Sequence, residues 1–112
     1  MLLKTRLKNI FEREGLDIDC SGLKNVNING AKIGCSGIVV DRKTNRELYI
    51  TTDAMPQLNG KIMYRACSGD LYNKFFGRDG INQFALESNI GSEVKRFLSL
   101  PDEMWRKVGG AC

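Results

Sequence analysis

Four cysteines are the residues of this sequence whose type and placement could do chemistry. Three of them, Cys20, Cys35 and Cys67, each begin the tripeptide Cys-Ser-Gly, and the fourth, Cys112, is the last residue. Four thiolates can close a tetrahedral zinc site, and a turn of small residues after a cysteine can aim backbone N–H groups at its sulfur. However, the sequence has no Cys-x-x-Cys pair, and Cys35 and Cys67 fall inside expected strands, where buried thiols are common. Separate thiols are therefore the favoured interpretation, and a zinc site is the alternative.

The sequence contains no histidine, so it lacks the usual general base and the commonest type of metal ligand. Residues 34–37 (Gly-Cys-Ser-Gly) have the glycines of a nucleophile turn, but they lead into a strand and not into a helix. Residues 17–22 begin like a calcium loop, yet Ile28 stands where the bidentate glutamate should be. Because no catalytic group has a partner at a useful spacing, we expect a protein that is not an enzyme.

The segment between residues 68 and 84 combines aromatic and basic side chains and follows neither the helical nor the strand period. A loop of this length in a small domain is usually functional. Its side chains could stack on bases and hold phosphates, or anchor a protein interface. Its phenylalanines could instead fold inward and cover the core. Trp105 is likewise either an interface anchor or a seal on the core. The candidate partner-binding residues are Tyr72, Lys74, Phe75, Phe76, Arg78 and Trp105.

Two regions with the helical period lie at the ends of the chain. Near the N-terminus the apolar residues fall on one helical face and Gly15 is placed to end the helix; they are Leu3, Leu7, Ile10 and Phe11. The same spacing returns at Ile90, Val94, Phe97 and Leu98. Pro101 then interrupts the pattern and begins a short second helix, which Gly109 and Gly110 end.

Alternation of apolar and polar residues predicts four strands in the middle of the chain, at about residues 25–29, 31–40, 47–52 and 62–67. Asn-Gly pairs at 29–30 and 59–60 predict tight turns. The expected fold is a single α+β domain over residues 1–112. It is a four-stranded antiparallel meander with an N-terminal helix and one or two C-terminal helices packed on one face.

The composition is that of an ordinary folded domain, with 112 residues, 42% of them hydrophobic and 27% charged. The net charge is +4, but 13 acidic residues are interleaved with 17 basic ones, so a mixed solvated surface and a nucleic-acid groove are about equally compatible with it. No apolar run approaches the roughly 20 residues of a membrane span, and no signal peptide is visible. We therefore expect a cytoplasmic protein without a membrane partner.

Several short runs resemble small uncharacterised proteins of phages and mobile elements in Gram-positive bacteria. They are residues 29–34 (Asn-Gly-Ala-Lys-Ile-Gly), 60–66 (Gly-Lys-Ile-Met-Tyr-Arg-Ala) and 80–84 (Gly-Ile-Asn-Gln-Phe), followed by the final helix. The resemblance covers about residues 29–98. In those relatives the loop after the Tyr-Arg strand carries a shorter Asp-Tyr and Gly-Gly stretch, which residues 72–77 replace here.

Small phage domains without catalytic residues often block host defences, as anti-CRISPR proteins do. By this analogy we expect an inhibitor or regulator of a host protein, such as a CRISPR effector, acting in the host cytoplasm. The positive net charge disfavours mimicry of DNA and leaves direct docking on the effector. The alternative is a nucleic-acid-binding accessory domain, in which phosphates would contact Arg42, Lys43, Arg46, Lys74 and Arg78.

Overall fold

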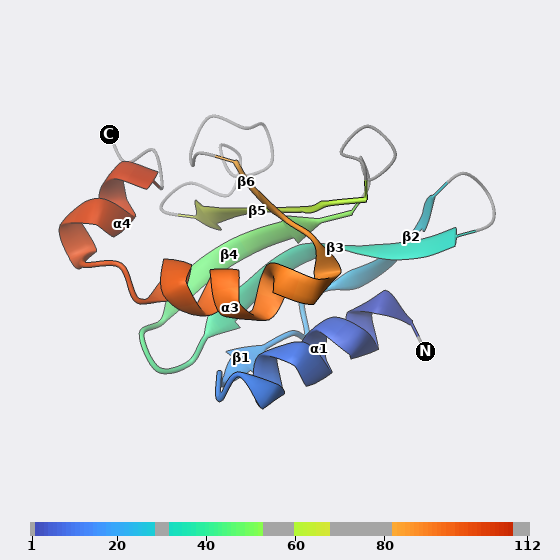
Figure 1. The fold of residues 1–112 in the computed structure, drawn as a ribbon, viewed down its shortest axis with the longest axis horizontal. Coiled ribbons are helices and arrows are strands. Elements are labelled where there is room, and N and C mark those ends of the chain that lie inside the picture. The colour runs from blue at the N-terminus through green and yellow to red at the C-terminus, as the bar shows by residue number, and fades with distance from the viewer. Residues whose placement is uncertain (1, 29–31, 53–59, 68–81, 109–112) are drawn as a thin grey trace.

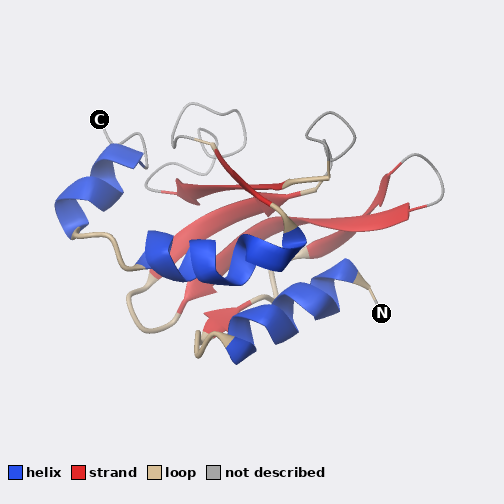
Figure 2. Ribbon diagram, in the orientation of Figure 1, coloured by secondary structure: helices blue, strands red, loops and turns tan. Residues whose placement is uncertain are grey.

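The computed structural model describes residues 2–28, 32–52, 60–67 and 82–108, and it has an α+β fold (Figure 1, Figure 2). Helices α1 (Leu3–Arg13) and α3 (Glu87–Leu98) lie side by side on one face of an antiparallel sheet, and the short helix α4 (Asp102–Val108) follows α3. The predicted α+β class, the antiparallel sheet and the helices at both ends of the chain are confirmed. No helix of the described part is long and apolar enough to cross a bilayer.

The prediction of four strands is wrong, because the described residues form six. They are β1 (Ile18–Asp19), β2 (Lys24–Ile28), β3 (Lys32–Asp41), β4 (Arg46–Thr51), β5 (Ile62–Cys67) and β6 (Gln83–Ala85). Their order across the sheet is β1-β3-β4-β5-β6, and β2 also pairs with β3. The two additional strands, β1 and β6, have two and three residues, which is too short for an alternating pattern to be recognised. Phe84, expected in a loop, belongs to β6.

Strands β1 and β2 are two parts of one interrupted strand along β3. Asp19 pairs with Val40 and Lys24 pairs with Ser36, so the four residues 20–23 lie opposite the three residues 37–39. The N–H of Leu23 donates to the carbonyl of Cys20 at 3.0 Å and closes a turn that takes up the extra residue. This geometry is that of a β-bulge, and it lets the chain leave and rejoin the same neighbouring strand.

The bulge also explains why two Cys-Ser-Gly tripeptides occur in this part of the chain. A Cβ on Gly37 would lie 2.0 Å from the carbonyl oxygen of Gly22, and a Cβ on Gly22 would lie 2.1 Å from the carbonyl oxygen of Ile38. The two backbones therefore pack directly against each other, at a distance that only glycine permits. The repeated tripeptide is a packing feature at these two positions.

The core lies between the helices and one face of the sheet. Cross-strand partners such as Val39 and Leu48, or Ile50 and Tyr64, point their side chains to the same face. Against them pack the apolar sides of α1 and α3, as the helical spacing predicted. The helix side chains in this core are Leu3, Leu7, Phe11, Ile90, Val94, Phe97 and Leu98.

The two helices meet at Gly91 of α3. A Cβ there would lie 2.7 Å from Cγ2 of Ile10 and 2.9 Å from Cγ of Glu14, both on α1 or its end. At the other end of the contact, Nε of Arg6 donates to Oε2 of Glu87 at 2.8 Å. Gly15 follows α1 with a φ of +76°, in the conformation that commonly ends a helix, so this predicted stop is confirmed.

Candidate binding surface

Most of the predicted partner-binding residues lie outside the described part of the chain. These are Tyr72, Lys74, Phe75, Phe76 and Arg78, together with the predicted metal ligand Cys112. Trp105 is described and is only 8% exposed. Its ring packs on Phe97, with the centroids 5.3 Å apart, and beneath the guanidinium of Arg46, whose Cζ is 4.8 Å from the ring centroid. Trp105 is therefore a side chain of the core in this structure.

Cys20, Cys35 and Cys67 are all buried free thiols. Within the described ranges, no three His, Cys, Asp or Glu side chains gather closely enough to hold a metal ion, so the structure does not bring these cysteines together. Burial raises the pKa of the Cys20 thiol, which favours the protonated, unreactive form. Cys35 is fully buried, and its N–H donates to Oγ1 of Thr52 at 2.8 Å.

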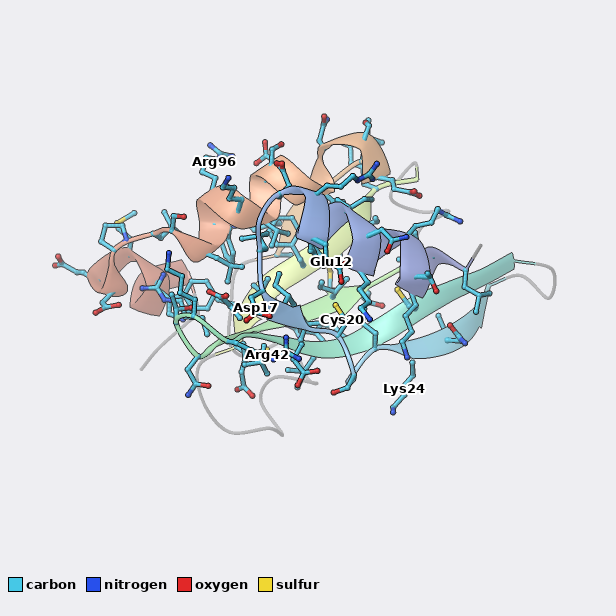
Figure 3. The ribbon with its side chains drawn as sticks, turned by 90° about the horizontal axis from the view of Figure 1, so that it is seen from below. Glu12, Asp17, Cys20, Lys24, Arg42 and Arg96 are labelled. Carbon is cyan, nitrogen blue, oxygen red and sulfur yellow. The ribbon has the colours of Figure 1, made fainter. Side chains whose placement is uncertain are left out.

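The basic residues proposed to contact nucleic acid are partly engaged within the molecule. Nη1 of Arg42 donates to Oδ1 of Asp17 at 2.6 Å, and this hydrogen bond raises the pKa of the guanidinium (Figure 3). The side chain of Arg46 is 12% exposed and is held by Asp102 at 2.6 Å. Of the described residues in this group, Lys43 is exposed. The structure thus directs two of the three described cations to intramolecular partners.

The strand register shows a second face of the sheet, opposite α1 and α3, which we call the open face. Each strand contributes alternate residues to it, and cross-strand partners such as Ile38 and Tyr49, Tyr49 and Arg65, or Met63 and Phe84 lie next to one another. The open-face residues whose side chains the structure describes are Asp19, Lys24, Val26, Ser36, Ile38, Val40, Glu47, Tyr49, Thr51, Met63, Arg65, Cys67 and Phe84.

The centre of the open face is an ordered aromatic and basic pair. Cζ of Arg65 lies 4.8 Å from the ring centroid of Tyr49, which is within the range of a cation–π interaction. The hydroxyl of Tyr49 is 3.0 Å from Oγ of Ser36 and is thereby fixed. Around this pair, Ile38 and Met63 are half-buried, and Phe84 is 47% exposed at the edge of the sheet. Arg65, Cys67 and Thr51 of this face are buried, so the accessible part around the pair is made by the half-buried Ile38, Tyr49 and Met63 and by the exposed Phe84.

Charge on the open face is balanced. It carries the cations Lys24 and Arg65 and the anions Asp19 and Glu47 among the residues that the structure describes. Figure 3 shows Lys24 extending away from the helix layer. A surface that follows a nucleic-acid backbone collects several Lys and Arg side chains with few acids among them. The described side chains of the open face do not have that composition.

Sequence reasoning placed the site in the segment after β5 and did not single out the open face. The signal was present, because the predicted strands already alternated Tyr49 with Leu48 and Met63 with Ile62. What was missing was the side of the sheet that the helices cover, and the existence of β6, which adds Phe84 to the face.

No family model, curated protein or solved structure matches this chain.

Proposed function

We propose that this chain is a non-enzymatic binding protein that docks on a partner protein through the open face of its sheet, and that it inhibits or regulates that partner. The resemblance to phage and mobile-element proteins suggests a host protein as the partner, for instance a CRISPR effector. Nothing in the proposal requires a cofactor.

The observation that carries the proposal is the composition of the open face. Tyr, Arg and Met, together with Phe, are enriched in the buried centres of protein interfaces, where charged residues other than Arg are depleted. Here Tyr49, Met63, Arg65 and Phe84 form one contiguous set across β4, β5 and β6. Arg65 is only 5% exposed, so it supports the ring of Tyr49 from within the face, and the accessible members of the set are Tyr49, Met63 and Phe84.

Charge balance favours a protein over a nucleic acid as the partner. Among the side chains that the structure describes on the open face, two acids accompany two bases, so a phosphate backbone would meet repulsion from Asp19 and Glu47 as well as attraction. An interface centred on aromatic and apolar contacts is also less sensitive to salt than one that releases counterions. The salt dependence of binding therefore separates the two functions.

The test is affinity capture from a bacterial host lysate, with the full chain as bait and nuclease added. The informative variant is Phe84→Ala, and the matched control is Met104→Ala, because Met104 is 44% exposed on α4 and lies off the open face. We expect one protein to be captured at moderate salt, at a level at least about tenfold lower with Phe84→Ala and unchanged with Met104→Ala.

Equal capture by both variants would overturn the assignment of the open face. Binding that disappears on nuclease treatment, or that falls steeply between low and moderate salt, would establish the nucleic-acid alternative instead. Recovery of no protein from any plausible host would count against a protein-binding function altogether.

A further inference from the structure

Helix α4 depends on the rest of the domain for its structure. It has seven residues, whereas isolated helices shorter than roughly 12–15 residues are marginal in water. Of its side chains that the structure describes, Asp102, Glu103 and Met104 are exposed and Trp105 is buried. Among the side chains described for this helix, Trp105 and the contacts at the first turn fix it to the domain.

A single side chain, Arg46, joins these contacts. From the first residue of β4, its Nη1 donates to the carbonyls of Leu98 at 3.1 Å and Leu100 at 2.6 Å, and its Nη2 donates to Oδ1 of Asp102 at 2.6 Å. The same guanidinium lies over the ring of Trp105. One planar group thus ties together the end of α3, the connection to α4, the first turn of α4 and the buried indole.

Beneath α4 lies an aromatic patch made by residues that do not depend on α4 for their position. The Trp105 ring covers Phe97, and the Phe97 ring contacts Tyr64 edge-on with the centroids 5.4 Å apart. Phe97 is held by α3 and Tyr64 by β5, both of which are also anchored in the core between α1 and the sheet. If α4 left, this support would remain and the aromatic patch would be exposed.

We infer that α4 can detach as a unit while the rest of the domain stays folded, and that the contacts of Arg46 hold it in place. The reason is that α4 is held by far fewer buried contacts than the main core. The main core is closed by many apolar side chains from α1, α3 and five strands, whereas among the side chains that the structure describes one indole and one guanidinium hold α4. Elements with few buried contacts open at a lower free energy than the domain as a whole. Opening exposes Phe97 and Tyr64 as an apolar surface distinct from the open face.

Hydrogen exchange of the full chain, followed by mass spectrometry, tests the inference directly. In the wild-type protein the amides of residues 105–108 are expected to exchange at least about tenfold faster than the slowest amides of α3. Arg46→Met retains an apolar stem of similar length and removes the guanidinium, and it should accelerate exchange in α4 by a further ten- to hundredfold. Arg46→Lys should give an intermediate acceleration, because lysine keeps the positive charge but lacks the planar guanidinium that donates to several acceptors at once.

Arg42→Met is the matched control, since Arg42 lies at the other end of the same β3–β4 turn and pairs with Asp17 at the surface. It should leave exchange in α4 unchanged. Trp105, the only tryptophan of the chain, supplies a second reading, because quenching of its fluorescence by acrylamide should rise in Arg46→Met and not in Arg42→Met. The inference fails if α4 and α3 exchange at the same rate in every variant, or if Arg46→Met leaves both the exchange and the quenching unchanged.

Discussion

Replacing the glycines of the β-bulge by alanine tests how β1 and β2 rejoin β3. Among the described glycines, two properties can be separated. Gly15 and Gly60 have left-handed φ values of +76° and +79°, and a Cβ on either would meet nothing within 4 Å. Gly22 has no left-handed φ, but its Cβ would collide with the carbonyl oxygen of Ile38. Gly37 combines a φ of +151° with a collision against Gly22.

The magnitudes follow from these two properties. A left-handed φ costs an L-residue about 1–2 kcal/mol, which is the whole effect expected for Gly60→Ala. The Cβ on Gly22 would be 2.1 Å from a backbone oxygen, so the paired strands must move apart by more than an ångström. Overpacking of this kind costs about 1–3 kcal/mol, and each weakened ladder hydrogen bond adds about 1 kcal/mol. We therefore expect about 3–5 kcal/mol for Gly22→Ala, and still more for Gly37→Ala.

The assay is urea unfolding followed by far-UV circular dichroism, which reports on the whole sheet and not on α4 alone. Because a domain of this size has a stability of about 5–15 kcal/mol, Gly22→Ala should lose a large fraction of it, and Gly37→Ala should be partly unfolded or fail to fold. In thermal melts each kcal/mol should lower Tm by about 4–8 °C. The reasoning is refuted if Gly22→Ala costs no more than Gly60→Ala, because the two backbones then do not meet as the structure has them.

Three further outcomes follow from the described contacts. The thiols of Cys20 and Cys35 should react with a thiol reagent only as fast as the core opens, as peptide mass spectrometry after timed labelling can measure; rapid modification would contradict their burial. Burial raises the pKa of Tyr64, so the neutral phenol adds to the free energy of unfolding below its unfolded pKa of about 10, and this stabilisation is lost as the pH rises further. Tyr64→Phe should therefore flatten the fall of stability with pH, as urea unfolding at a series of alkaline pH values can measure. Glu87→Gln, which removes the half-exposed ion pair with Arg6, should cost at most about 1 kcal/mol at low salt and less at high salt, and a larger loss would show that the pair does more than join two helix surfaces.

Periodicity alone determined much of the secondary structure. The spacing of Leu3, Leu7 and Phe11 predicted an amphipathic helix, and the structure buries all three. The alternation around Leu48 and Ile50 predicted a strand with one apolar face, which the structure also has. These predictions held because they need only local information: a helix repeats every 3.6 residues and a strand every two, whatever lies opposite them.

Other features were decided only by contacts between segments far apart in the sequence. Gly22 and Gly37 occur in similar tripeptides, but only the pairing of two strands with β3 brings their backbones together. Trp105 could have been an exposed anchor or a core residue, and in the fold it lies beneath Arg46, which precedes it by 59 positions and donates to the carbonyls of Leu98 and Leu100. Neither relation leaves a pattern in the neighbouring residues.

The open face likewise has one property that the sequence predicts and one that only tertiary packing decides. Alternation indicated that Tyr49 and Met63 share a face, and it could not say whether the helices cover that face or the other one. That choice is made by packing, because the face with Val39, Leu48 and Ile50 removes more apolar area from water when α1 and α3 close over it. The opposite face keeps Tyr49 half-buried and Phe84 47% exposed, and it is the face that we propose for a partner.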